Sequence, residues 1–171
     1  MPTYVGLLRA VNVGGTGKLP MSDLRALCEA AGFEAVRTYI ASGNVVFRSE
    51  LPIQDARGRL EERLAGYAGK PVGVVMRTAG DLTAVLAANP FPDATPNRVL
   101  VTFLNDPLPR DAVERISGRT TEEIVLADRE IYVHYLDGMG NSKLSIAAAR
   151  PGTARNLNTV AKLVEMSAAE A

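Results

Sequence analysis

The spacing of apolar residues predicts alternating strands and helices in the first half of the chain. Residues 3–11 are apolar on both parities, as in a buried strand, and leucines recur at helical spacing in two later segments. We expect strands at residues 3–11, 35–40, 45–48 and 72–77, and helices at 21–31 and 54–68. Ser42-Gly-Asn44 suits the reversal between the second and third strands. The predicted order is βαββαβ.

The second half begins with the same kind of pattern after a proline-rich break at residues 90–96. A short helix is predicted just before it, at 82–89. We expect strands at 98–104, 121–127 and 130–135, and helices at 110–117, 142–149 and 154–168. This half has no obvious final strand, so the last helix could instead pack back on the first half.

These patterns predict an α+β protein with two ferredoxin-like halves of βαββα type. Each half would hold an antiparallel sheet with helices packed on one face. We place the halves at residues 1–89 and 90–171. The repetition lies in the order of elements, because no residue-level repeat is evident.

Composition narrows the functional classes. No apolar run approaches the roughly 18 residues of a membrane-spanning helix, and the N-terminus does not resemble a signal peptide. Cys28 is the single cysteine and His134 the single histidine, which excludes an intrachain disulfide and disfavours a zinc site. We therefore expect a cytoplasmic protein without a metal, a cofactor or a membrane partner.

The charges are unevenly distributed although their formal sum is zero. Residues 1–22 and 138–164 contain no Asp or Glu. Their basic residues are Arg9, Lys18, Lys143, Arg150, Arg155 and Lys162. A zero net charge disfavours broad nucleic-acid binding, whereas local basic windows are compatible with a small anionic partner. The sequence does not determine self-association.

The loop Asn12-Val-Gly-Gly-Thr-Gly-Lys18 resembles a phosphate-binding P-loop but fails the test for one. Asn12 stands where the first glycine is required, and Leu19 stands where the Ser or Thr that contacts magnesium is required. Two interpretations remain. The glycines expose backbone N–H groups to an anion, with Arg9 and Lys18 adding charge, or they only supply turn conformations.

Two C-terminal segments have related features. Asp137-Gly-Met-Gly-Asn-Ser-Lys143 is predicted to precede a helix, with Asn141 or Ser142 as its N-cap and Lys143 in its first turn. Thr153-Ala-Arg-Asn-Leu-Asn-Thr159 is predicted to open the last helix, with Thr153 as N-cap. Arginine beside amides suits recognition of phosphate, carboxylate or a base edge. A loop at a solvated surface is the alternative for both segments.

Catalytic patterns are sparse. His134 is predicted to be structural because it lies within a strand, and Cys28 is predicted to lie in or near the core. Glu61-Glu62, Glu122-Glu123 and Asp128 are predicted to face solvent and suggest no carboxylate pair. No candidate general base can be named from the sequence.

Five segments together resemble the bacterial "domain of unknown function 1697" family. They are residues 7–15, 18–21, 39–47, 137–144 and 153–159. Leu157 departs from the tryptophan expected there in many relatives. The resemblance implies a two-part, ferredoxin-like α+β fold and no established activity.

Our leading hypothesis is a binding module for a small anionic or nucleotide-like ligand. One cleft would be lined by Arg9, Asn12, Lys18, Asn44, Lys143, Arg155, Asn156 and Asn158. An enzyme acting on a phosphorylated small molecule, and an adaptor for nucleic acid or protein, are the alternatives.

Overall fold

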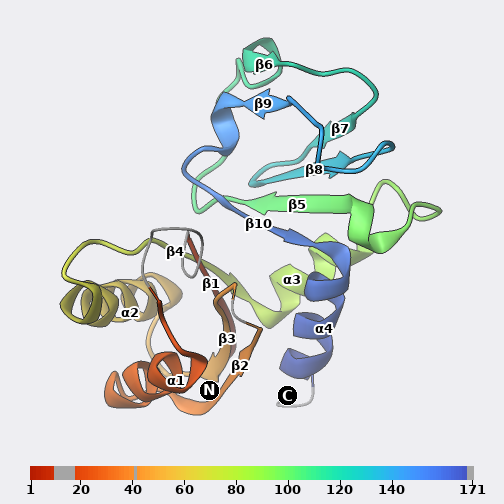
Figure 1. Cartoon of the computed structure of the whole chain (residues 1–171). Coiled ribbons are helices and arrows are strands. Elements are labelled where there is room, and N and C mark those ends of the chain that lie inside the picture. The colour runs from red at the N-terminus through yellow and green to blue at the C-terminus, as the bar shows by residue number, and fades with distance from the viewer. Residues whose placement is uncertain (10–17, 41, 169–171) are drawn as a thin grey trace. The chain divides into compact units, whose positions relative to one another are not determined.

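The computed structural model describes residues 1–9, 18–40 and 42–168 (Figure 1). The chain forms two compact units. Unit 1 comprises Met1–Thr83 together with the segment that begins at Lys162, and unit 2 comprises Ala84–Ala161. The division at residue 89 stays a prediction. Asn12 and most of its loop lie outside the described residues.

Unit 1 is built on a four-stranded antiparallel sheet. Its strands are β1 (Thr3–Leu8), β2 (Glu34–Tyr39), β3 (Asn44–Arg48) and β4 (Val74–Thr78). Their order across the sheet is β2-β3-β1-β4. Helix α1 (Met21–Ala30) joins β1 to β2, and helix α2 (Ile53–Ala68) joins β3 to β4. The predicted βαββαβ order is therefore confirmed.

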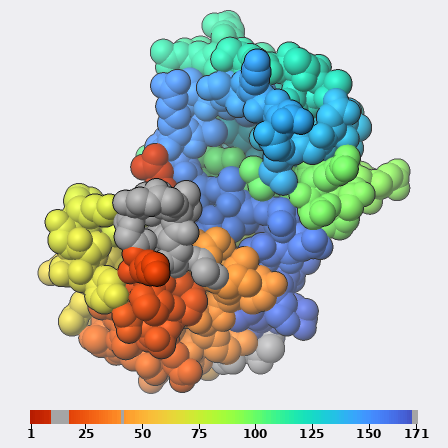
Figure 2. All heavy atoms as spheres, in the orientation of Figure 1, coloured from red at the N-terminus to blue at the C-terminus, as the bar shows by residue number. Residues whose placement is uncertain are grey.

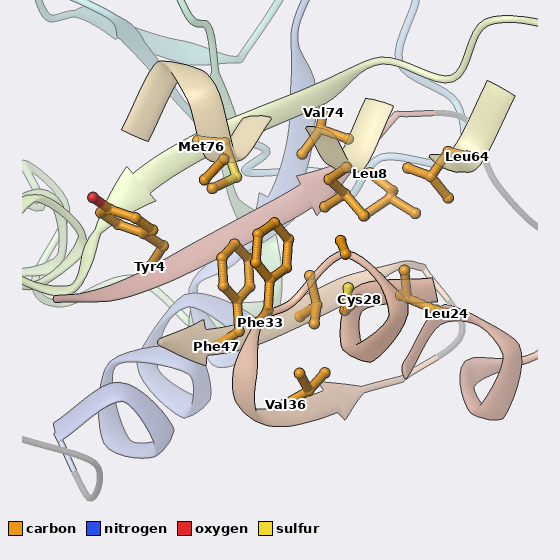
Figure 3. Close-up of a cluster of buried hydrophobic side chains, with 14 of the residues drawn as sticks. Tyr4, Leu8, Leu24, Cys28, Phe33, Val36, Phe47, Leu64, Val74 and Met76 are labelled. Carbon is orange, nitrogen blue, oxygen red and sulfur yellow. The ribbon is translucent and has the colours of Figure 1, made fainter. Parts of the chain in front are cut away.

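A hydrophobic core lies between this sheet and the two helices (Figure 3). Phe47 from β3 and Phe33 stack in parallel, with ring centroids 4.1 Å apart. Leu24 and Cys28 enter the same core from α1. Cys28 is fully buried and burial raises the pKa of its thiol to about 12, so the prediction of a core cysteine is confirmed.

The opposite face of the unit 1 sheet is also buried. Val5, Val46 and Val75 are each at most 2% exposed. The end of the C-terminal helix α4 (Leu157–Ala168) belongs to this unit, and Arg37 of β2 donates from Nη2 to the Met166 carbonyl at 2.6 Å. A strand buried on both faces has a continuous apolar sequence, which explains the pattern of residues 3–8.

Unit 2 contains a second four-stranded antiparallel sheet. Its strands are β5 (Val99–Phe103), β7 (Glu123–Leu126), β8 (Glu130–His134) and β10 (Thr153–Asn156), in the order β10-β5-β8-β7. Helix α3 (Ala79–Ala87) precedes it. The β8 tyrosine, Tyr132, donates its hydroxyl proton to the Val85 carbonyl of α3 at 2.7 Å. The short strands β6 (Ile116–Ser117) and β9 (Ser145–Ile146) pair separately.

Three predicted helices of the second half were wrong in whole or in part. Residues 110–117 form only the 3-10 turn η2 (Val113–Arg115) and β6. Residues 142–149 form β9 and the 3-10 turn η3 (Ala147–Ala149). Both segments are too short to be stable helices alone, and pairing of β6 with β9 determines their conformation. A further 3-10 turn, η1 (Pro96–Arg98), precedes β5.

The last helix begins later than predicted because the segment before it is a strand. Thr153–Asn156 forms β10, which pairs antiparallel with β5. Thr153 is therefore not the N-cap of α4. β10 is also the final strand of the second sheet, which the sequence pattern did not reveal.

The two sheets share one connection plan. Ordered along the chain as first to fourth, the strands of each sheet lie in the order second, third, first, fourth. The fourth strand carries a buried arginine at the same register position in both sheets. Arg77 of β4 lies opposite Val5 of β1, and Arg155 of β10 lies opposite Val101 of β5. Arg77 is fully buried and Arg155 is 7% exposed.

The helix that follows each arginine starts in the same way. Thr78 accepts the Asp81 N–H at 3.0 Å at the start of α3, and Asn156 accepts the Thr159 N–H at 3.0 Å at the start of α4. Both contacts join an N-cap side chain to the third helical residue. The succession of strand, arginine, cap and helix is therefore present twice.

Candidate functional site

The candidate site in unit 1 lies at the end of the sheet where β1 finishes. Arg9 follows β1 directly and is exposed, and its N–H donates to the Gly73 carbonyl at 2.9 Å. The Leu8 N–H donates to the Gly43 carbonyl at 2.8 Å. The end of β1 is thus held between the β2–β3 turn and the connection from α2 to β4.

Asn44 fixes the β2–β3 turn. Its side chain is fully buried, and its Nδ2 donates to the Tyr39 carbonyl at 2.9 Å and to Ser42 Oγ at 3.0 Å. Ile40, in the same turn, has a φ of 50° and is 47% exposed. A β-branched residue in the left-handed region is strained. Asn44 therefore acts here as a residue that positions the turn.

Lys18 lies between β1 and α1 in the sequence. It precedes Leu19, which is buried in the unit 1 core, and α1 begins three residues later. Leu24 of α1 and Leu8 at the end of β1 belong to the same hydrophobic core (Figure 3). The Lys18 side chain is exposed and makes no hydrogen bond or ion pair with any other residue that the structure describes.

In unit 2, the glycine-rich loop that carries Lys143 encloses a carboxylate of the protein itself. Glu122 is only 4% exposed, and one of its oxygens accepts the Thr120 N–H at 2.7 Å. Its other oxygen accepts the Ser142 hydroxyl in a short contact. Nearby, Thr121 donates to Asp137 Oδ2 at 2.6 Å. We call residues 118–123 and 137–144 the clasp.

The clasp replaces the predicted helix start at Lys143. Lys143 is exposed and has no side-chain partner among the described residues, while Ser142 binds Glu122 rather than capping a helix. The prediction that Glu122 faces solvent was wrong. The sequence gives no sign of its burial, because the hydroxyl that binds it comes from a segment 20 residues away.

Hydrogen bonds hold the pKa of Glu122 at about 2, the largest contribution coming from Ser142 and the next from Thr120. The folded state therefore favours the ionised carboxylate. Its contribution to stability is complete above the ordinary pKa of 4.5 and decreases as the pH falls toward 2.

Accordingly, Glu122→Gln is expected to make the stability of the protein depend less on pH between about pH 2 and 4.5. Thermal unfolding of both proteins between pH 2 and 5 would measure the effect. The Tm difference between wild type and variant should shrink as the pH falls. Glu114→Gln, at an exposed site, is the control and should leave this pH dependence unchanged. A Tm difference for Glu122→Gln that is independent of pH would contradict the role of the clasp.

Arg155 lies within the unit 2 sheet. Its Nη1 donates to Thr153 Oγ1 at 2.8 Å and to the Ala154 carbonyl at 2.9 Å. Burial lowers the pKa of the guanidinium to about 10, so it remains charged at neutral pH. Asn156 caps α4 through its Oδ1, and Asn158 is exposed in the first turn of that helix.

The structure therefore gives the predicted site residues different environments. Within unit 1, Arg9 and Asn44 lie at the end of the sheet where β1 finishes, and Lys18 lies shortly before α1; Arg9 and Lys18 are exposed. Within unit 2, Arg155 and Asn156 make local contacts around the start of α4. The sequence reading missed Arg77, which has no helical or alternating pattern around it that would mark a buried arginine.

His134 is in contact with protein groups on two sides. Its Nδ1 lies 2.8 Å from Glu123 Oε1, and its ring packs against Phe91 with a centroid distance of 5.4 Å. These contacts agree with a structural histidine. Among the described residues, no group of three or more His, Cys, Asp or Glu side chains could hold a metal ion.

The sequence matches the model of a protein family, described as "Protein of unknown function (DUF1697)", over residues 1–132. The chain belongs to the DUF1697 family. The fold resembles that of the conserved bacterial protein SP0830 from Streptococcus pneumoniae, with a TM-score of 0.81 and 25% sequence identity. The similarity covers 97% of this chain and 98% of that chain. No curated protein matches the sequence significantly.

Membership of DUF1697 agrees with the resemblance found in the sequence, and it brings no activity with it. Within the described part of this DUF1697 protein, no helix has the length and apolar character needed to cross a membrane. The exposed charges and their surroundings are therefore the features from which a function can be inferred.

Proposed function

We propose that this DUF1697 protein binds a small anionic or nucleotide-like ligand at the end of the unit 1 sheet. The observation that carries the proposal is the exposed cation Arg9 at the end of β1, beside a turn fixed by the buried Asn44, with the exposed Lys18 shortly before α1 in the chain. Lys70, also exposed, lies in the connection that receives the Arg9 N–H. Asn12 belongs to the same proposal through its place in the loop between the two cations.

The acidic groups near this end have protein partners of their own. Asp23 accepts the Tyr67 hydroxyl at 2.7 Å, and Glu61 accepts the Val74 N–H at 3.1 Å while pairing with Arg57. Such engagement reduces the competition that carboxylates would offer to an external anion. A cationic surface with occupied carboxylates favours a phosphate or carboxylate ligand.

Lys143, Arg155, Asn156 and Asn158, all in unit 2, stay predicted ligand contacts. Arg155 and Asn156 already bind protein groups, and Lys143 and Asn158 are exposed. We propose Arg9 and Lys18 as the primary ligand contacts. Asn44 would act indirectly by holding the turn.

Titration of the protein with inorganic phosphate and with AMP, followed by amide chemical shifts, tests the proposal. Arg9→Gln and Lys18→Gln are each expected to weaken binding by about tenfold, the equivalent of one charge-assisted hydrogen bond. Arg25→Gln is the control, since Arg25 is exposed on α1 and pairs with Glu29. Unchanged binding in both test variants would overturn the proposal. Lys143→Gln measures whether the exposed Lys143 of unit 2 contributes to binding.

We further propose that both sheets follow the ferredoxin-like plan and that the protein acts in the cytoplasm. The first proposal is supported by the common strand order and by the two helices on one face of the unit 1 sheet. The second is supported by the single cysteine, which is buried and offers no disulfide.

A further inference from the structure

A groove runs between α1 and α2 on the helical layer of unit 1. Figure 2 shows both helices at the molecular surface. The groove has a volume of about 670 Å³, which lies within the usual range for small-molecule sites. Its wall includes Leu27 and Ala30 from α1, and Arg59, the acidic Glu62, Arg63, Gly66 and Tyr67 from α2.

A hydrogen bond between the helices fixes each end of the groove. Near one end, Arg59 Nη1 donates to the Ala31 carbonyl at 3.3 Å. Toward the other end, the Tyr67 hydroxyl donates to Asp23 Oδ2 at 2.7 Å. Tyr67 is 46% exposed although its hydroxyl is held by this hydrogen bond. The groove is therefore preorganised and has an aromatic wall.

In the sequence of α2, Arg63 lies midway between Arg59 and Tyr67, the two residues that make the hydrogen bonds to α1. It is four residues from both Arg59 and Tyr67, just as Leu27 is four residues from both Asp23 and Ala31. Arg63 is exposed and makes no hydrogen bond or ion pair with any residue in the described ranges. A guanidinium of this kind can bind a carboxylate or a phosphate through two parallel hydrogen bonds.

Gly66 keeps one side of the groove open. It lies inside α2, and a Cβ added there would meet nothing within 4 Å. Glycine within a helix costs about 0.5–1 kcal/mol relative to alanine, and sterics do not require it here. Gly58 is also interior to α2 and equally unobstructed, but it is not part of the groove wall. It provides a matched control.

We propose that this groove binds a small molecule consisting of an anionic group on an apolar body. The anion pairs with Arg63, and the apolar body lies against Leu27 and the ring of Tyr67. The proposal concerns a surface separate from Arg9 and Lys18 and does not depend on the function proposed above.

Phenyl phosphate, benzoate and inorganic phosphate are the probes, each titrated while the amide signals of α1 and α2 are followed. Phenyl phosphate or benzoate is expected to shift these signals saturably, and comparison of the two identifies the preferred anion. Arg63→Gln and Gly66→Leu should each weaken the better probe by about tenfold, whereas Gly58→Leu should change binding by less than about twofold. Circular dichroism on all variants checks that α2 is intact.

Three results would overturn the proposal: absence of saturable shifts with both aromatic probes, equal binding by inorganic phosphate, or equal loss in Gly58→Leu and Gly66→Leu. Lys18→Gln separates the two sites. Probe binding lost in Lys18→Gln but retained in Arg63→Gln would reject the groove and support the sheet-end site. The reverse pattern would support the groove alone.

Discussion

Arg77→Ala is expected to lower the free energy of unfolding by about 3–5 kcal/mol, the range for losing a large buried side chain together with its hydrogen bonds. Arg77 is the largest of the fully buried side chains, and its Nη1 donates to the Met76 carbonyl at 3.0 Å. Alanine would leave both a cavity and an unsatisfied polar group. Urea unfolding followed by circular dichroism would measure the change.

Two further variants determine the cause of that loss. Arg77→Met keeps most of the apolar volume, so it should cost less than Arg77→Ala. Arg63→Ala removes an exposed arginine and should stay within about 0.5 kcal/mol of wild type. A loss below about 1 kcal/mol for Arg77→Ala would mean that the buried guanidinium contributes little to the fold.

Gly118→Ala is expected to destabilise the protein by about 2–5 kcal/mol, combining left-handed strain with overpacking. Gly118 has a φ of 71°, and a Cβ there would lie 2.0 Å from the Lys143 carbonyl oxygen. Because that atom belongs to backbone, the clasp could accept the methyl group only by separating. Chemical denaturation gives the loss of stability, and amide signals of residues 137–144 report on the clasp.

Gly138→Ala isolates the effect of the clash. Gly138 has a φ of 81°, but a Cβ there would meet nothing within 4 Å. Its substitution should cost only the conformational strain, about 1–2 kcal/mol. Equal losses at the two glycines would show that the close approach to Lys143 has no energetic weight.

The first sheet was predictable from sequence because its strands and helices carry strong local patterns. Residues 3–8 and 45–47 are almost wholly apolar, and α1 and α2 present leucines at helical spacing. Local pattern and tertiary packing agree there, so each element adopts in the fold the conformation that its local sequence favours.

The second sheet was harder to predict because long-range pairing determines its short elements. Thr153-Ala-Arg-Asn156 has neither alternation nor β-branched runs, and Thr153 resembles an N-cap. Pairing with β5 nevertheless makes it a strand. Likewise, Ser145–Ala149 has alanine-rich helical propensity, and the pairing of β9 with β6 overrides it.

In the candidate site, too, some features follow from the local sequence and others from long-range contacts. Exposure of Arg9 and Lys18 agrees with the charge of these side chains and with their place in an acid-free segment. The burial of Arg155 was not predictable, because it follows from the register that sets Arg155 opposite Val101. The occupation of the second glycine-rich loop by Glu122 depends on a contact between distant segments, which no local pattern encodes.

The composition of unit 1 has a consequence for synthesis on the ribosome. Its first 83 residues emerge early, yet the same unit includes the chain from Lys162 onward, and Arg37 binds the carbonyl of Met166. An N-terminal domain ordinarily completes its fold before the rest of the chain is translated. Here one buried face of the nascent sheet stays uncovered until Lys162 and the residues after it, which form the end of α4, have been translated.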